Sequence, residues 1–529
     1  MQNEFDHKKI LHILQNRAGV LNLIGRNEEA LKDVKNGLNI AKKFSDKKSE
    51  ADCLIQLSHI YNSISKYDEM LNLAQESLSF YQEINDKKGE AESLINIGCV
   101  HTSLGDYQKA LEYFSKSLKI QEEIGDREGQ ATSLHNIGAV HNNLGDYPKA
   151  FEHYSKSLKI DEEIGHRKNQ ATSLHNIGVV HTSLGDYQKA VEYLSKSLKI
   201  QEEIGDREGQ ATSLINIGAV HGYFGDYPKV LECCSKSLKI GEEIGDHWGQ
   251  GYSLNNIGNV HSRLGNYPKA LEYYSKSLKI QEEIGDRSGQ AISLNNTGNV
   301  HYSLGNYLKA LNYHTKSLKI REEIGDRGSQ AYNLKDLGKS SIGLQDFAKA
   351  REYLNNALKI AREIGEKEVL REIYVSLGEL EMEEQRTEGR KQKAEKAKTY
   401  AETALKLSEE LKSRGGKADA LLLQARIRVS ELMSLGVEEL KSLGVIKWQE
   451  TEEKFKSAIK IFEELKQPYE IAKAYFYYAQ SIKSVGTELV PVQFDDKAKE
   501  YLQKAKEIFE KIGAKAWLRK IGEIGVSSA

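Results

Sequence analysis

Asparagine side chains recur every forty residues along the middle of this 529-residue chain. An amide can donate one hydrogen bond and accept another at the same time, so a row of amides can bind a peptide backbone whatever the sequence of that peptide. Asparagines three or seven positions further along extend the row. The candidate binding residues of this kind are Asn96, Asn136, Asn176, Asn216, Asn256, Asn296, Asn259, Asn299 and Asn143.

Other polar residues fall near the face that these asparagines define. His135 and His175 would contact a partner there, and Arg263, Lys335 and Lys339 indicate a positively charged end that could bind a carboxylate. A second interpretation stays open. In it, the asparagines bond to one another or to water between successive repeats and serve only the stacking of those repeats.

Fifteen histidines raise the question of a metal site. Six of them follow the forty-residue spacing, at His101, His141, His181, His221, His261 and His301. Equivalent residues of neighbouring repeats lie about 10 Å apart if helices stack side by side, whereas zinc–nitrogen bonds are only about 2.0–2.1 Å long. We therefore expect these histidines to pack between helices, and we expect no metal and no cofactor.

The chain shows no arrangement of residues that is typical of catalysis. Glutamate pairs such as Glu122 and Glu123 follow lysines at helical spacing, which indicates solvated ion pairs. The recurring Gly-Asp-Arg-x-Gly-Gln phrase lacks the Gly-Lys-Ser/Thr of a phosphate-binding loop. We expect that the protein is not an enzyme.

The composition excludes several classes of partner. A formal net charge of -2 leaves no basic stripe for nucleic acid. The four cysteines are too few and too irregularly spaced for a disulfide framework, which favours a reducing compartment. No apolar run approaches the roughly 18 residues of a membrane span, and residues 1–20 lack the apolar segment of a signal peptide. We expect a soluble, cytoplasmic protein without membrane insertion.

Each forty-residue unit contains the signals of two helices. Residues at spacings of three and four predict a first helix, namely Leu134, Ile137, Gly138, His141 and Leu144 in one unit. Gly145 predicts the end of that helix, because glycine accepts the left-handed conformation there. Asp146 is a suitable N-cap for a second helix, and Pro148 fits its first turn. The unit is therefore predicted to be a helical hairpin, with the linker Glu122 to Gln130 joining one hairpin to the next.

Glycine also occupies the eighth position of the first helix in most units. These residues are Gly98, Gly138, Gly178, Gly218, Gly258, Gly298 and Gly338. A glycine inside a helix costs about 1 kcal/mol relative to alanine. Its recurrence predicts that a neighbouring helix approaches closely at this position.

The pattern resembles the signature of the tetratricopeptide repeat family. The residues that carry the resemblance are Leu134, Ile137, Gly138, His141, Gly145, Tyr147, Ala150, Tyr154 and Leu158. The forty-residue length is similar to a longer subclass that includes Pins/LGN adaptors, kinesin light chains and arrays in bacterial signalling proteins. The resemblance implies an all-α fold, a right-handed α-solenoid superhelix of about twelve hairpins, with partner peptides bound along its concave side.

Three segments are predicted from the regularity of the repeat. Residues 1–370 form a regular array of about nine repeats, residues 371–512 form divergent repeats with insertions, and residues 513–529 form a C-terminal capping helix and tail. The run from Glu379 to Lys398 alternates in charge sign, which is typical of a solvated helix extension. The first repeat lacks an N-terminal cap, which raises the possibility that the chain associates with itself there.

The sequence therefore favours a scaffold or adaptor that binds peptide segments of partner proteins in a concave groove. The alternative is the sensor or regulatory arm of a bacterial signalling system. Such an arm would act on a kinase, cyclase or protease in another chain or outside this sequence.

Overall fold

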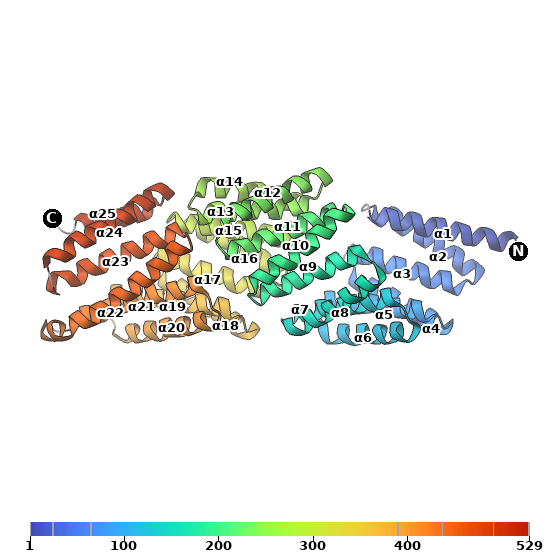
Figure 1. Ribbon diagram of the computed structural model, residues 1–529, viewed down its shortest axis with the longest axis horizontal. Coiled ribbons are helices and arrows are strands. Elements are labelled where there is room, and N and C mark those ends of the chain that lie inside the picture. Colours follow the sequence, from blue (N-terminus) through green and yellow to red (C-terminus); the bar gives the residue numbers. More distant parts are fainter. Residues whose placement is uncertain are drawn as a thin grey trace. The chain divides into compact units, whose positions relative to one another are not determined.

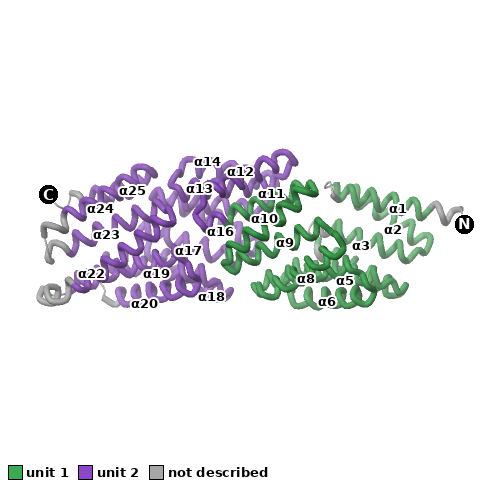
Figure 2. Tube along the Cα trace, in the orientation of Figure 1, with its two compact units in different colours: residues 1–220 green, residues 221–529 purple. Residues whose placement is uncertain are grey.

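Helices are the regular elements of the computed structural model, which describes residues 2–23, 26–63, 66–388, 391–435, 437–489 and 491–526. Over those residues the chain forms 25 α-helices in consecutive hairpins and no strand (Figure 1). The predicted all-α solenoid of about twelve hairpins is confirmed. The chain divides into two compact units, residues 1–220 and residues 221–529 (Figure 2).

Unit 1 holds the first ten helices and most of the eleventh, which runs across the boundary at residue 220. Their bounds are α1 Gln2–Leu23, α2 Asn27–Phe44, α3 Lys47–Ser63, α4 Tyr67–Glu83, α5 Lys87–Ser103, α6 Tyr107–Ile124, α7 Arg127–Asn143, α8 Tyr147–Ile164, α9 Arg167–Ser183, α10 Tyr187–Ile204 and α11 Arg207–Tyr223.

Unit 2 holds the remaining helices, which become longer toward the C-terminus. Their bounds are α12 Tyr227–Ile244, α13 His247–Arg263, α14 Tyr267–Glu283, α15 Arg287–Ser303, α16 Tyr307–Glu323, α17 Arg327–Gly343, α18 Phe347–Ile364, α19 Lys367–Glu388, α20 Lys391–Glu410, α21 Arg414–Met433, α22 Val437–Glu464, α23 Pro468–Leu489, α24 Pro491–Ile512 and α25 Lys515–Val526. The domain bounds at residues 370 and 512 stay a prediction.

Glycine and aspartate set the helix ends, as the sequence predicts. Gly125 ends α6 with a φ of 73°. The side chain of Asp126 then accepts a hydrogen bond from the backbone N–H of Gly129, at 3.1 Å, and caps α7. The predicted linker is therefore wrong in one respect. Only Gly125 and Asp126 connect the two helices, because Arg127 already belongs to α7.

The glycine at the eighth position of each first helix meets a large side chain of the second helix. A Cβ placed on Gly98 would lie 2.6 Å from Cε1 of Phe114, and one on Gly258 would lie 2.6 Å from Cε1 of Tyr274. Phe114 and Tyr274 are themselves buried. The predicted close approach of neighbouring helices is confirmed. It occurs within each hairpin.

Serine and glutamine join one hairpin to the next. Ser117 of α6 donates to the carbonyl of Ala91 in its own hairpin, at 2.8 Å, and accepts from Ser133 of α7, at 3.3 Å. Gln130 Nε2 donates to the carbonyl of Gln121 near the end of α6, at 3.0 Å. The backbone carbonyls at the end of the second helix are thus partly satisfied by the following hairpin.

Unit 2 folds back on itself through its last helices. Trp517 of α25 and Ile512 of α24 belong to the same buried cluster as Tyr267 and Val300. A Cβ on Gly265 would run into Ile512, so the turn between α13 and α14 touches the end of α24. The last helices therefore bound the inner face of unit 2, and the site described below lies on this face.

We predict opposite effects of alanine at two helical glycines of unit 1. Gly98→Ala places a methyl group against the Phe114 ring. It should destabilise the protein by about 1–3 kcal/mol, since overpacking outweighs the helix propensity of alanine. Gly19→Ala in α1 meets nothing within 4 Å and should stabilise by up to about 1 kcal/mol. Urea unfolding of the two variants measures both effects. A Gly98→Ala protein as stable as Gly19→Ala would contradict the packing role.

Candidate functional site

The asparagines of unit 1 lie between successive first helices and bond across them. Asn176 Nδ2 donates to His135 Nε2 at 3.3 Å, and Asn216 Nδ2 donates to His175 Nε2 at 3.1 Å. Asn96 is only 6% exposed and bonds to a histidine of α3. In unit 1, therefore, these amides form a ladder between repeats, which is the second interpretation that the sequence left open.

Burial fixes the protonation of the two histidines in this ladder. Burial lowers the pKa of both His135 and His175, so both rings are neutral near pH 7. His175 accepts from Asn216 through Nε2, so its Nδ1 carries the proton and can donate to Ser213 Oγ at 3.1 Å.

Two further asparagines of unit 1 occupy different surroundings. Asn136 is half-buried in α7, and Asn143 is exposed at the end of the same helix. A small cavity of about 130 Å³ lies beside this row, lined by His135 and Asp161 among others. Its volume holds a few water molecules and leaves no room for a peptide segment.

A larger cavity lies within unit 2, where the first helices of six hairpins meet. It measures about 530 Å³ and is lined from α13, α15, α17, α19, α21 and α23, with two tyrosines from the second helix α14. The structure brings together here six of the residues predicted from sequence: Asn259, Asn296, Asn299, Arg263, Lys335 and Lys339. Asn256, half-buried in α13, is not among the lining residues.

The amides of this cavity are only partly engaged. Asn296 Nδ2 donates to Asn259 Oδ1 at 3.1 Å and to Asn255 Oδ1 at 2.9 Å. The hydroxyl of Tyr274 also donates to Asn259 Oδ1, at 2.8 Å. The side chain of Asn299 makes no hydrogen bond within the described ranges, so its donor and acceptor are both available to a ligand.

The cavity also holds acidic residues that the sequence analysis did not single out. Lys335 Nζ lies 3.0 Å from Asp336 Oδ1 and 2.5 Å from Glu372 Oε2. These carboxylates raise the pKa of Lys335 although burial opposes it. Lys335 is thus committed to internal ion pairs, and Arg263 and Lys339 remain as the cations that could bind a carboxylate.

Neither of those two cations has an ion-pair partner in the part of the chain that the structure describes. Arg263 is exposed at the end of α13, beside the cavity. Lys339 Nζ lies 5.0 Å from the centre of the Tyr302 ring, a cation–π contact, and its charge also acts on the nearby carboxylates of Asp336 and Glu379.

The charged run that starts at Glu379 is not solvated, so that prediction is wrong for its first turns. Burial would raise the pKa of Glu379, yet the nearby Lys473, Lys339 and Arg426 lower it to about 2. Lys473 Nζ lies 3.1 Å from Glu379 Oε1. Glu381 is 1% exposed and pairs with Arg351 at 2.7 Å. These glutamates hold helices together instead of facing water.

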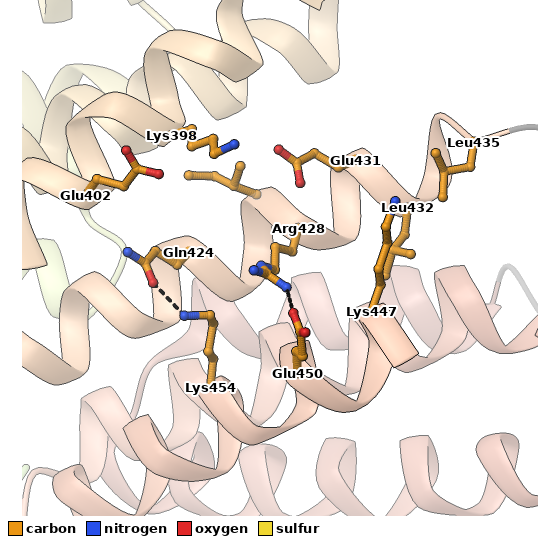
Figure 3. Close-up of a pocket in the computed structure, with 11 residues that line it drawn as sticks. Lys398, Glu402, Gln424, Arg428, Glu431, Leu432, Leu435, Lys447, Glu450 and Lys454 are labelled. Atoms are coloured by element: carbon orange, nitrogen blue, oxygen red, sulfur yellow. Dashed lines mark hydrogen bonds and ion pairs between the residues drawn. The ribbon is translucent and has the colours of Figure 1, made fainter. Parts of the chain in front are cut away.

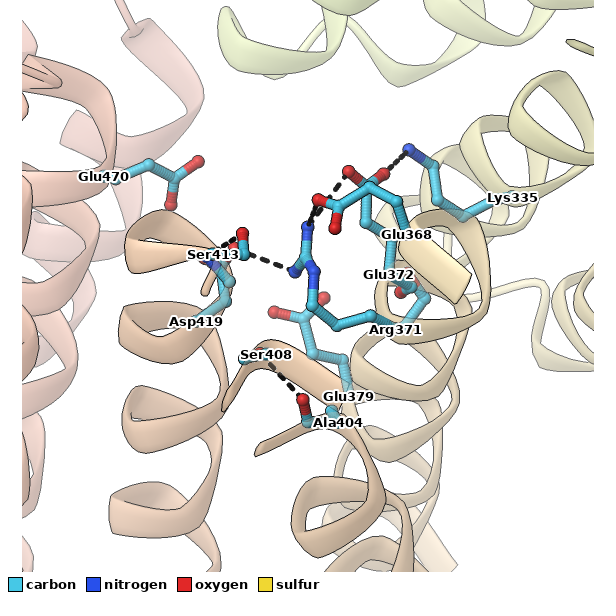
Figure 4. Close-up of polar contacts among 12 residues, drawn as sticks. Lys335, Glu368, Arg371, Glu372, Glu379, Ala404, Ser408, Ser413, Asp419 and Glu470 are labelled. Atoms are coloured by element: carbon cyan, nitrogen blue, oxygen red, sulfur yellow. Dashed lines mark hydrogen bonds and ion pairs between the residues drawn. The ribbon is translucent and has the colours of Figure 1, made fainter. Parts of the chain in front are cut away.

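Two carboxylates face each other in the same cavity. Burial, and then the charge of Glu470, raise the pKa of Asp419 to about 7. Arg371 lies 3.9 Å from Asp419 but also bonds to Glu368 at 2.6 Å (Figure 4). Glu470 Oε2 is buried, receives no hydrogen bond from the described residues and lies 3.9 Å from Lys473 Nζ. Both carboxylates therefore share their cation with a closer carboxylate, because Lys473 lies 3.1 Å from Glu379.

A second cavity of about 770 Å³ adjoins the first and shares Tyr302, Glu379 and Lys473 with it. It is richer in aromatic groups, including Trp517. The guanidinium of Arg426 lies 3.8 Å from the centre of the Tyr477 ring there. This stacking engages one cation of the second cavity, whose lining also includes Arg386, Arg519 and Lys520.

A third cavity, of about 490 Å³, lies among α20, α21 and α22 (Figure 3). Two of its cations are already engaged. Arg428 forms an ion pair with Glu450, and Lys454 Nζ donates to Gln424 at 2.7 Å. This cavity lies apart from the asparagine row, since none of the predicted binding residues lines it.

The recurring histidines pack against rings, as predicted. His101 stacks on Tyr113 and His181 on Tyr193, with ring centres 5.4 Å and 5.3 Å apart. Within the described residues, no three His, Cys, Asp or Glu side chains gather closely enough to hold a metal ion. None of the helices in those ranges combines the length and apolar content that a membrane span requires.

Comparison with protein-family models gives two matches. The tetratricopeptide repeat model matches six overlapping stretches, at residues 54–123, 89–163, 129–203, 169–243, 209–283 and 249–323. A model of anaphase-promoting complex subunit 5 matches residues 3–63 and 306–384. No curated protein sequence matches the chain significantly.

Several solved structures are similar in fold. A Rap protein complexed with competence and sporulation factor shares 15% identity over 68% of this chain and 99% of its own, with a TM-score of 0.49. Aspartyl phosphate phosphatase F from Bacillus subtilis shares 15% over 66% and 93%, with a TM-score of 0.47. A STAND protein with a tetratricopeptide repeat sensor from Pyrococcus horikoshii shares 17% over 65% and 53%, with a TM-score of 0.45.

The raised pKa of Asp419 predicts a pH-dependent stability. The unfolded carboxyl ionises near 3.8 and the folded one near 7, so the folded state retains a proton between these values. The free energy of unfolding therefore falls as pH rises through this window. Asp419→Asn removes that loss, so the variant should gain stability over the wild type from about pH 4 to about pH 7.

Urea unfolding at several pH values across the window measures this difference. Asp146→Asn serves as the control, because Lys149 and the backbone of α8 lower the pKa of that exposed carboxyl, and it should show no gain toward neutral pH. If the free energy of unfolding changes with pH in the same way for Asp419→Asn and the wild type, the pKa of Asp419 is not raised in the folded protein.

Proposed function

Because the tetratricopeptide repeat model matches just over half of the chain, the protein belongs to that family, and we propose that it is a scaffold that binds a peptide segment of a partner protein in the cavity of unit 2. The cavity combines the free amide of Asn299 with two cations that form no ion pair among the described residues and with two carboxylates whose cations are shared with other carboxylates. This combination carries the proposal. The amides of unit 1 contribute less, because Asn176 and Asn216 are already bonded to histidines.

The size of the cavity suits a short segment. Its volume of about 530 Å³ lies within the range of roughly 300–1,000 Å³ that is common for ligand sites. An extended chain rises about 3.3 Å per residue, so only a few residues would be enclosed and the rest would lie outside. A folded domain would not enter.

The charges specify which segment binds best. Arg263 and Lys339, from α13 and α17, would bind a carboxylate of the segment. Asp419 and Glu470, from α21 and α23, would bind an ammonium or guanidinium group, which would also release the proton that Asp419 retains. Between these contacts, Asn299 can bond to a backbone amide and carbonyl.

The same geometry supports the second candidate function, a regulatory arm that passes on ligand binding to an effector. Two of the helices that line the cavity, α13 and α23, are far apart in the sequence of unit 2. The segments that contain them meet where Gly265 contacts Ile512. A ligand that touches both walls would stabilise this contact and bias the form of unit 2 that an effector meets.

Affinity capture from native lysate tests the scaffold proposal. Partners held by the wild type are identified, and overlapping peptides from them are titrated against the wild type and an Arg263→Ala, Asn299→Ala double variant. At about 0.5–3 kcal/mol for each of the two lost contacts, the variant should bind at least about fivefold more weakly. Asn143→Ala changes an exposed amide outside the cavity and should bind like the wild type.

The unfolding midpoint of each variant shows whether it is folded. A folded double variant that keeps every partner and its affinity would exclude the cavity of unit 2 as the binding site. Loss of affinity in both variants would place the site elsewhere in the array.

A further inference from the structure

The first helix of the chain exposes an apolar stripe. Ile10, Ile13 and Val20 of α1 are 47%, 62% and 58% exposed. They lie three and seven positions apart, so they follow one line along the helix. The other side of α1 is packed, with Leu11 and Ala18 at most 2% exposed.

The forty-residue register shows what this stripe corresponds to in later hairpins of unit 1. The residues equivalent to Ile13 are Cys53, Ser93, Ser133, Ser173 and Ser213, and those equivalent to Val20 are Ile60, Val100, Val140, Val180 and Val220. All ten are at most 2% exposed. Where contacts are recorded, they face the preceding hairpin. Ser133 bonds to Ser117 of α6, and Val140 shares a core cluster with Phe114 of α6.

The stripe on α1 therefore occupies the positions through which later hairpins stack, and it is largely exposed. Ile10 and Ile13 are more apolar than the Gln130 and Ser133 to which they correspond. Such a surface marks an interaction site.

A further hairpin would make fewer contacts on this surface than most later repeats make with one another. Gln130 and Ser133 each donate a hydrogen bond to the hairpin before them. Ile10 and Ile13 cannot make these bonds. An isoleucine also exceeds the space that a fully buried serine occupies, and overpacking of this kind costs about 1–3 kcal/mol.

We propose that the chain associates with a second copy of itself through α1, with the stripe of Ile10, Ile13 and Val20 packed against the same stripe of the other copy. A two-fold interface brings the same residues of both copies together, so an apolar stripe meets an apolar stripe. This contact continues the established helix-on-helix stacking by one further helix. It does not depend on the function proposed for unit 2.

The size of the contact sets its strength. The 22 residues of α1 span about 33 Å, and one helix packed on its copy buries less than a standard interface. The dimer should accordingly be reversible, with a monomer–dimer equilibrium that responds to protein concentration.

Sedimentation equilibrium of the full chain tests the proposal. The wild type should fit a monomer–dimer equilibrium, and an Ile13→Glu, Val20→Glu double variant should raise the dissociation constant by about 100-fold or more, because a dimer would bury unpaired charges. Both positions are exposed in the monomer, so the variant should fold. The matched control is Leu144→Glu, Leu184→Glu, which changes two turn residues of unit 1 that are 51% and 50% exposed and should dimerise like the wild type.

A disulfide gives a second, independent readout. Burial raises the pKa of all four native thiols, to about 11 for Cys53 and Cys99, so they react slowly near about pH 8. Ile13→Cys adds an exposed thiol at the centre of the stripe, and mild oxidation should yield a covalent dimer.

Four outcomes would overturn the proposal. These are a wild-type chain that stays monomeric at its highest soluble concentration, a dimer that the glutamate variant leaves intact, a mass that grows beyond two copies, and the absence of a cross-link through Cys at position 13. A mass beyond two copies would indicate head-to-tail stacking instead of the two-fold contact.

Discussion

The close approach of two helices at a glycine is the contact on which the array depends. Phe114 lies where the Cβ of any other residue at Gly98 would be, and Tyr274 and Gly258 repeat the arrangement. This contact sets the distance between the helices of a hairpin. Serine and glutamine hydrogen bonds then set the distance between hairpins. Because most hairpins between α5 and α18 repeat these contacts, their first helices present equivalent faces, and residues forty positions apart in sequence become neighbours.

The sequence shows this regular part well, because its signals are local. Gly145 and Asp146 mark a helix end and a helix start within two residues, and the structure places both ends there. Ion pairs between hairpins have no such signal. Glu379 meets Lys473, which is 94 positions away, and Glu381 meets Arg351. An alternating charge run therefore resembled a solvated helix, although tertiary partners bury its first glutamates.

The sequence predicted the amides and cations of the candidate site but not its carboxylates. The amides and cations of α13, α15 and α17 were identified from their register, and six of them line one cavity. The carboxylates Asp419 and Glu470 were missed, since they lie in the divergent hairpins, where no register predicts their neighbours. The cavity itself depends on the return of the last helices, α23 to α25, toward α14 and α15, a long-range contact that the repeat pattern does not encode.

The account rests on peptide binding by the inner face of unit 2. Hydrogen–deuterium exchange of the full chain, with and without a peptide from a captured partner, tests this most directly. We expect the peptide to slow exchange in α13, α15 and α23, whose side chains line the cavity, and to leave the second helices α16 and α18, which contribute no lining residue, unchanged. Protection confined to unit 1, or spread over the second helices, would contradict the account.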